Sequence, residues 1–210
     1  MQFNPVELST VAIKKLMTGT IVPRPIAWIS TINADGQPNL APFSFFNAVC
    51  PQPPTLLFCP EVRSTDGKLK DTLRNILESG EFVVNVVTEE LAEAMNATAT
   101  EFPPEINEFE LAGVTAVPSM LVKPPRVAES PVNFECKLTQ IVEIGEGKGS
   151  GSVVIGEILY MHIRDDVLLP DHKIDVRALK PVSKLAGPEF SHLGDIFDML
   201  RGPSQINLSR

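Results

Sequence analysis

Nineteen prolines among 210 residues are the feature that most limits what this chain can fold into. A proline inside a helix removes a backbone hydrogen bond and clashes with the preceding turn, so prolines at this density break up long helices. The chain also contains 13 glycines but only one tryptophan and one tyrosine. This composition favours a β architecture whose strands are bounded by loops.

The formal net charge is −8, from 18 basic and 26 acidic residues, and it argues against some classes of binding partner. A protein that binds DNA or RNA through phosphates needs a dense basic surface, so we do not expect nucleic acid binding. A hydrophobic fraction of 43% and a charged fraction of 21% are ordinary for a globular chain with a buried core.

The cysteines and the N-terminal residues bear on the compartment. Cys50, Cys59 and Cys136 are odd in number and form no C-x-x-C pair, so we expect buried free thiols rather than disulfides or a thiolate metal site. The chain has no basic segment followed by an apolar one at its start, and no run of about 18 uncharged apolar residues that could span a membrane. We therefore expect a cytoplasmic protein without membrane contacts.

Hydrophobic periodicity and turn residues predict more strands than helices. Helices are expected at 4–19, 69–80, 89–99 and 193–200. Strands are expected at 26–32, 39–46, 55–59, 82–87, 132–144, 153–164 and 181–185, with a mostly irregular connection that has short turns at 102–125 and a surface loop or arm at 165–175. Because the strands follow one another, antiparallel pairing is favoured. We predict a mainly β (α+β) antiparallel barrel of six or seven strands with peripheral helices, in a single domain over residues 1–210.

Sequence motifs for common enzymatic chemistry are missing. The glycine-rich segment 145–151 has glycine after Lys148 where a phosphate-binding loop has serine or threonine, so a hairpin turn is favoured. There is no G-x-G-x-x-G of a Rossmann fold and no G-x-S-x-G nucleophile elbow. The chain has three histidines, His162, His172 and His192, and their spacing is not that of metal ligands. We predict no metal site and name no catalytic residue.

Residues 63–74 concentrate basic side chains in this acidic chain. Four of the 18 bases lie in this segment, beside the hydroxyls of Ser64 and Thr72 and at the expected start of a helix. Free N–H groups at a helix N-terminus, together with lysine or arginine, can bind a phosphate dianion. A solvated helix face, with Lys70 and Arg74 one turn apart, explains the same pattern equally well.

The segment Asn39–Asn47 combines two amides, one hydroxyl and three phenylalanines with a proline inside the expected strand. Pro42 cannot donate to a strand ladder, which suggests a sheet edge or a bulge whose backbone groups can meet a ligand. A phenylalanine-rich core strand is the simpler alternative.

Four stretches in consistent order carry a family resemblance that extends over about residues 18–190. They are Pro23-Arg24-Pro25-Ile26-Ala27-Trp28-Ile29-Ser30-Thr31, then Asp35-Gly36-x-x-Asn39-Leu40-Ala41-Pro42-Phe43-Ser44-Phe45-Phe46-Asn47, Lys70-Asp71-Thr72-x-x-Asn75-Ile76 and Gly80-Glu81-Phe82-Val83-Val84-Asn85. Together they resemble the flavin reductase-like family of FMN-binding split-barrel proteins. The resemblance implies a six-stranded antiparallel split barrel, a homodimer with FMN near the subunit interface, and hydride transfer from NADH or NADPH to flavin.

The resemblance also implies one shared ligand for the two segments described above. The family's counterpart of Asn39–Asn47 contacts the isoalloxazine and ribityl chain, and its counterpart of Ser64 and Lys70–Thr72 holds the phosphate. We add Arg63 for its charge and position. The expected FMN-binding residues are Asn39, Ala41, Pro42, Phe43, Ser44, Asn47, Arg63, Ser64, Lys70, Asp71, Thr72 and Phe190.

The segment Lys184–Phe190 departs from the Arg-Leu-Gly-Gly-x-Tyr-like segment that the family often has near the flavin or nicotinamide. Lysine lacks the planar guanidinium, and Phe190 lacks the hydroxyl of tyrosine. The departure affects the expectation of nicotinamide recognition more than that of FMN binding. It is consistent with a subfamily that uses a different electron donor or acceptor.

Flavin chemistry would account for the missing catalytic motifs, because the cofactor itself carries the electrons. The leading hypothesis is an NAD(P)H:FMN oxidoreductase that could pass reduced flavin to a partner monooxygenase. One alternative is a non-catalytic FMN-binding electron-transfer protein, similar to flavoredoxin. Another is an FMN-dependent oxidase of a pyridoxamine-like substrate, which would need a basic site for the substrate phosphate.

Overall fold

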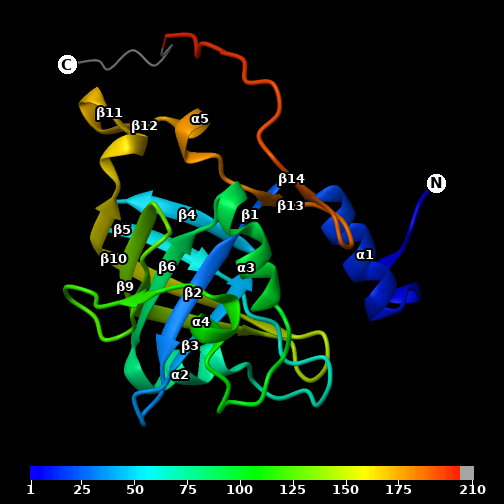
Figure 1. Ribbon diagram of the computed structural model, residues 1–210. Helices are drawn as coiled ribbons and strands as arrows, with labels where there is room; N and C mark the ends of the chain where they lie inside the picture. The colour runs from blue at the N-terminus through cyan, green and yellow to red at the C-terminus, as the bar shows by residue number, and fades with distance from the viewer. Residues whose placement is uncertain (204–210) are drawn as a thin grey trace, which may run out of the picture.

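The structure, a computed structural model that describes residues 1–203, is centred on one seven-stranded antiparallel sheet (Figure 1). The strands lie in the order β3-β2-β6-β9-β10-β5-β4. Their bounds are Ala27–Ile32 (β2), Pro38–Phe43 (β3), Phe46–Pro51 (β4), Pro54–Phe58 (β5), Glu81–Val86 (β6), Val132–Ile144 (β9) and Gly151–Ile163 (β10). The predicted mainly β architecture with antiparallel pairing is confirmed.

The two edge strands of this sheet, β3 and β4, are consecutive along the chain. Only Ser44 and Phe45 separate the last residue of β3 from the first residue of β4. A sheet whose opposite edges are joined by two residues must curl until those edges meet, which closes it into a barrel. In the described sheet β3 and β4 are not ladder neighbours, so the barrel is split where they meet. We call residues Phe43–Phe46 the seam.

The seam was not foreseen. We expected a single strand over 39–46 and, from the family resemblance, six strands in the barrel. The structure ends β3 at Phe43 and begins β4 at Phe46, so the sheet has seven strands and the count of six is not confirmed. The run Phe43-Ser44-Phe45-Phe46 contains no glycine, asparagine or proline to signal a turn in the sequence.

The helices follow the sequence pattern in part. We expected one helix over 4–19, but a 3-10 turn, Pro5–Glu7, is separated from α1 (Thr10–Thr20) by Leu8 and Ser9, and the Ser9 side chain caps α1. The expected helix at 69–80 is α2 (Asp71–Ser79), which ends at the left-handed Gly80 as predicted. The expected helix at 89–99 is a 3-10 turn, Glu89–Leu91, followed by α3 (Ala92–Ala97).

One expectation about helices is wrong. Residues 193–200 form no helix, because they are exposed and a short helix without a packing partner is not stable. The connection over 102–125 is mostly irregular, as expected, but it also contains α4 (Glu108–Ala112) and the short strand β7 (Ala116–Val117), which pairs with β8 (Arg126–Val127). None of the described helices is long and apolar enough to cross a membrane.

The remaining elements lie around the barrel. Residues 165–175, expected as a loop or arm, form two 3-10 turns (Asp165–Val167 and Pro170–His172) with β11 (Leu168–Leu169) and β12 (Lys173–Ile174), followed by α5 (Val176–Leu179). A small sheet combines β1 (Arg24–Pro25), β13 (Ser183–Lys184) and β14 (Phe190–Ser191). Figure 1 shows this small sheet beside α1, which projects from the barrel.

The core has two parts because successive residues of β2 face opposite sides of the sheet. Ala27 and Ile29 belong to the cluster that fills the barrel, where the Phe58 ring packs against Phe43 and Phe82 with centroids 5.2 and 5.4 Å away. On the outer side, buried Trp28 packs in a second cluster with residues of α3 and α4.

The cysteine prediction is right for one residue and wrong for another. All three thiols are free, and Cys136 is buried. Cys59 is half-buried, whereas Cys50 lies exposed on β4 because the side chains of this edge strand face solvent from Asn47 onward.

Asn85, the last residue of the Gly80–Asn85 stretch, has a structural role. Its buried amide donates to the Trp28 carbonyl and to Ser30, at 3.0 and 3.2 Å. Its oxygen accepts from the Val127 backbone N–H and the Asn133 amide, both at 2.9 Å. The side chain therefore ties three strands to the end of the connection that follows α4.

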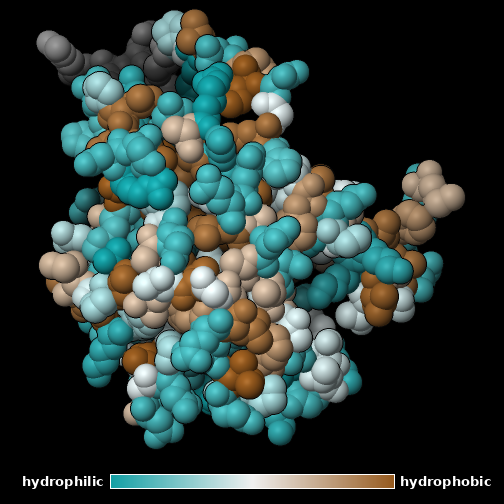
Figure 2. Space-filling model, viewed as in Figure 1, coloured by the Kyte–Doolittle hydropathy of each residue, from teal (hydrophilic) through white to brown (hydrophobic). Residues whose placement is uncertain are grey.

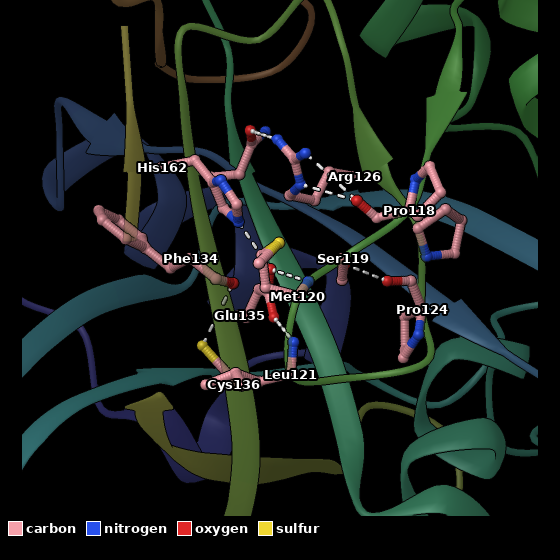
Figure 3. A network of polar contacts seen from close by, with 12 residues as sticks. Pro118, Ser119, Met120, Leu121, Pro124, Arg126, Phe134, Glu135, Cys136 and His162 are labelled. Atoms are coloured by element: carbon pink, nitrogen blue, oxygen red, sulfur yellow. Dashed lines mark hydrogen bonds and ion pairs between the residues drawn. The ribbon is translucent and has the colours of Figure 1, made fainter. Parts of the chain in front are cut away.

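Glu135 on β9 holds the middle of the same connection (Figure 3). Its carboxylate has no exposed surface and accepts the backbone N–H groups of Met120 and Leu121, at 2.7 and 2.6 Å. His162 on β10 lies 2.6 Å from the same carboxylate. Burial alone would raise the pKa of Glu135, but the hydrogen bonds from Met120, His162 and Leu121 outweigh it and lower the pKa.

The substitution Glu135→Gln tests this anchor. An acid whose pKa is lowered by folding stabilises the protein above its unfolded pKa and loses that contribution as the pH falls through the folded value. We expect the variant to lose about 2–4 kcal/mol of unfolding free energy near neutral pH. The deficit should shrink as the pH falls below about 4, and urea unfolding across pH measures it. Glu78→Gln, at an exposed position of α2, is the control; a deficit that does not change with pH would contradict the role of the carboxylate.

Candidate functional site

Three clefts meet at the seam end of β3, and Pro42 lines all of them. The α3 cleft, of about 700 Å³, lies between β3, α3 and the β13–β14 hairpin. The α1 cleft, of about 690 Å³, lies between the seam, α1 and residues 184–187. The α2 notch, of about 40 Å³, lies between β3, the start of α2 and residues 98–102. A ligand bound along β3 would reach all three.

Every second residue of β3 directs its backbone groups away from β2, toward the free edge of the sheet. None of these residues presents a free N–H group to solvent. Leu40 directs its N–H away from β2, toward the Glu108 carboxylate at 3.2 Å. Pro38 and Pro42 stand two residues on either side and so face the same way, but a proline has no N–H. The predicted sheet edge at Pro42 is therefore confirmed, and its outward backbone groups are carbonyl acceptors.

Glu108 from α4 was not identified from the sequence. It is 9% exposed, and burial raises the pKa of its carboxyl group, with a further increase from the charge of Asp71. The side chain fixes α4 against the strand edge and lines the α2 notch. A single acidic residue in a proline-punctuated connection gives no sequence signal for such a role.

The N-terminus of α2 is not capped by a side chain. Lys70 occupies the N-cap position without a capping hydrogen bond, and the first backbone bond of the helix runs from Arg74 to Lys70. The N–H groups of residues 71–73 have no acceptor among the described residues. Free N–H groups at a helix start attract anions.

Basic side chains surround this helix start. Asp71 pairs with both Arg63, at 2.5 Å, and Arg74, so one carboxylate offsets part of two positive charges. Lys70 lies at the junction of the α2 notch and the α1 cleft, with its ammonium 5.9 Å from the Phe43 ring centroid. Glu101 and Glu108 also line the notch, so the helix start combines basic and acidic side chains.

A hydrogen bond aligns β3 with α2. The Asn39 amide donates to the Thr72 hydroxyl at 3.0 Å, and Thr72 is 1% exposed. Three residues later, Asn75 donates to Thr31, while its buried side-chain oxygen has no partner in the described structure. Thr72 therefore has a structural contact in addition to the phosphate contact expected for it.

The structure brings most of the predicted site residues together. The α2 notch contains Asn39, Ala41, Pro42, Arg63, Lys70, Asp71 and Thr72. The α3 cleft contains Pro42, Phe43, Ser44 and Phe190. Asn47 and Ser64 line none of the three clefts: both are exposed, and the Asn47 oxygen accepts the adjacent Ala48 N–H.

Arg24 is a second site residue that the sequence list omitted. Only 6% exposed, it donates to the carbonyls of Thr18 and Ile21 at the end of α1, at 2.7 and 2.6 Å. It also donates to the Leu185 carbonyl at 2.9 Å and to Ser44 in the seam at 3.4 Å. Burial lowers the pKa of this guanidinium. The residue stands in the Pro23-Arg24-Pro25 stretch, but nothing in that spacing indicates a cleft.

The comparisons with known proteins match this geometry. Residues 18–180 match the profile described as flavin reductase like domain. The chain belongs to the flavin reductase-like family. Membership implies that it binds a flavin and uses a nicotinamide donor.

Solved structures show the same fold. Nitrilotriacetate monooxygenase component B from Bacillus cereus is 34% identical, with 95% of this chain and 98% of that chain covered and a TM-score of 0.90. The 2-nitrobenzoate 2-nitroreductase NbaA of Pseudomonas fluorescens is 31% identical, with both chains fully covered (100% each) and a TM-score of 0.84. A protein of Shewanella frigidimarina NCIMB 400 with a split barrel domain is 21% identical over 96% of this chain and 100% of that chain, with a TM-score of 0.83.

Arg24→Met tests whether the guanidinium holds α1 against the seam. The variant keeps an apolar stem but loses four hydrogen bonds, so we expect about 2–4 kcal/mol less stability and faster proteolysis between α1 and β1. Arg164→Met is the control, because its pair with Asp166 is exposed to solvent and contributes little to stability. Urea unfolding and limited proteolysis measure both; equal losses in the two variants would contradict the role of Arg24.

Proposed function

We propose that this protein binds FMN along β3 at the seam and reduces it with NADH or NADPH. The observation that carries the proposal is the uncapped start of α2, with Lys70 and Arg63 in the notch, beside a strand edge that presents carbonyl groups. Such a site suits a ligand with an anionic group at one end and a hydrogen-bond donor at the other. FMN has a phosphate at one end and a ring with an N–H group at the other.

Each group of residues would then have a defined task. The N–H groups of residues 71–73 and the Lys70 ammonium would hold the phosphate, with Arg63 nearby. Asn39 and Ala41 would line the ribityl chain, and the ring would rest against Pro42 and the seam. Bound flavin accepts hydride, which the side chains of this chain cannot do.

The open clefts leave room beside the ring for a second substrate. The α3 cleft runs from the seam to Phe190 on β14, and its lining is mostly apolar. An apolar wall excludes water and lets a flat nicotinamide stack near the ring. The protein would thus contribute binding, orientation and desolvation.

A homodimer is part of the proposal. No residue of α1 is buried, and Val11, Met17 and Ile21 are exposed at its surface or end. Figure 2 shows apolar side chains on this projecting N-terminal arm. A second copy that packs against the arm would cover them and close the clefts from outside. Component B of nitrilotriacetate monooxygenase is a similar chain, which supports a monooxygenase as the recipient of reduced flavin.

A non-catalytic electron-transfer protein remains the second candidate, because Lys184 departs from the arginine expected there. The Lys184 ammonium is held by the carbonyls of Gly187 and Glu189 and lies 4.2 Å from the Phe190 ring centroid. Engaged in this way, it has fewer donors left for a nicotinamide dinucleotide than a guanidinium would have.

Stopped-flow spectroscopy separates the two functions. For the reductase, mixing FMN-loaded protein with NADH or NADPH should bleach the flavin and consume the nicotinamide well above the rate with free FMN. An electron-transfer protein would bind FMN and be bleached only by a protein donor. No flavin binding in fluorescence titration would contradict both.

Lys70→Ala tests the phosphate site, with Lys68→Ala as the matched control. Lys70 lines the notch. Lys68 is exposed, and its ammonium lies 3.9 Å from the Asp66 carboxylate. Loss of a charge-assisted bond should weaken FMN binding about 10–100-fold in Lys70→Ala and leave Lys68→Ala near wild type. Equal FMN affinities in a fluorescence titration would move the phosphate elsewhere.

A further inference from the structure

The α1 cleft concentrates positive charge, and the proposed FMN site uses only one of its basic side chains. Five basic side chains line it against one acid, Glu61, which already pairs with Lys14. The five are Lys14, Lys15, Arg24, Lys70 and Lys184. In a chain of net charge −8 this is a local reversal of sign, and only Lys70 is shared with the α2 notch.

Arg24 contributes a buried positive charge to this cleft, rather than one solvated at the surface. A guanidinium has five N–H groups, and the described residues provide acceptors in four hydrogen bonds. Those acceptors are three carbonyls and a hydroxyl, and none is a carboxylate. A buried cation without a charged partner is costly, so an anion in the cleft beside it would be favoured.

Lys184 stands close to Arg24 in the same wall. Its ammonium contacts carbonyl oxygens, and no acid pairs with it among the described residues. Burial lowers the pKa of Lys184, and the nearby charge of Arg24 lowers it further, while the charge of Glu189 acts in the opposite direction without reversing the shift. The two cations repel each other, and an anion between them would relieve that repulsion.

The cleft also has an apolar wall next to the flavin position. Phe43, Phe45 and Val11 line it, and it shares Pro42 and Ser44 with the α3 cleft. Its volume of about 690 Å³ is that of a small-molecule site. A molecule with a flat part and an anionic part could therefore lie with the first at the seam and the second among the lysines.

We propose that the α1 cleft binds the phosphate or carboxylate group of the small molecule that exchanges electrons with the flavin. The inference rests on the proposed function for the identity of that molecule. Two sources share the chemistry: the pyrophosphate of a nicotinamide dinucleotide and the carboxylate of an aromatic electron acceptor. Lys15, exposed on α1 and without an ion pair in the described structure, is the residue through which the site is tested most cleanly.

The experiment is calorimetric titration of protein saturated with FMN, using inorganic pyrophosphate and benzoate as separate probes. Saturation fills the FMN phosphate site, so any remaining anion binding reports a second site. Lys15→Glu reverses one charge of the cleft, and Lys137→Glu, exposed on β9, makes the same change elsewhere. We expect at least one probe to bind wild type, about tenfold or more weaker binding to Lys15→Glu, and no change in Lys137→Glu.

The outcomes separate the sources and the hypotheses. Binding of pyrophosphate alone supports the dinucleotide, and binding of benzoate alone supports the carboxylate acceptor. Loss of all anion binding on saturation with FMN would overturn the inference, because the cleft would then be part of the flavin site. Equal weakening in the two variants, or no binding of either probe, would overturn it too. Titration of flavin-free protein keeps these results distinct from a failure to bind FMN.

Discussion

The two-residue link between the edges of the sheet is the constraint on which the rest of the structure depends. Because Ser44 and Phe45 join β3 to β4, the sheet has to close, and the closure leaves the unpaired edge of β3 beside a sharp change of chain direction. An unpaired edge invites association with other strands. Here two of the outward-facing positions of β3 are prolines, and the N–H of the third, Leu40, donates to Glu108. The edge can therefore accept hydrogen bonds from a ligand but cannot pair with another strand in the usual way.

Charge is distributed to match this geometry. The chain is acidic overall, yet basic side chains line the α1 cleft and stand at the start of α2, both beside the exposed edge of β3. Long-range repulsion of anions by the protein as a whole is screened over about 10 Å at moderate salt, whereas contacts inside a cleft are screened less. Local arrangement, rather than net charge, therefore decides which ligands these clefts can take.

The sequence predicts the parts of this protein that rest on local patterns. Runs of apolar and β-branched residues predict β2, β6, β9 and β10, and the basic residues of 63–74 mark the start of α2 as a candidate phosphate site. The seam could not be recognised, because an apolar run hides the turn at Ser44. Arg24 and Glu108 were also missed, since Glu108 bonds a backbone group 68 residues away and Arg24 joins nearby carbonyls to one that lies 161 residues away. The absent helix at 193–200 shows the opposite failure, where an apolar pattern has nothing to pack against.

Arg24 connects these observations, because its four bonds join three segments that the chain order keeps apart. The end of α1, the turn after β13 and Ser44 in the seam all meet at one guanidinium. Any group that binds beside this cation also acts on the position of α1, and any movement of α1 changes the donors facing the seam. A partner that packs against the exposed side of α1 would in this way be coupled to the ligand in the cleft through direct contacts, without a change in the barrel itself.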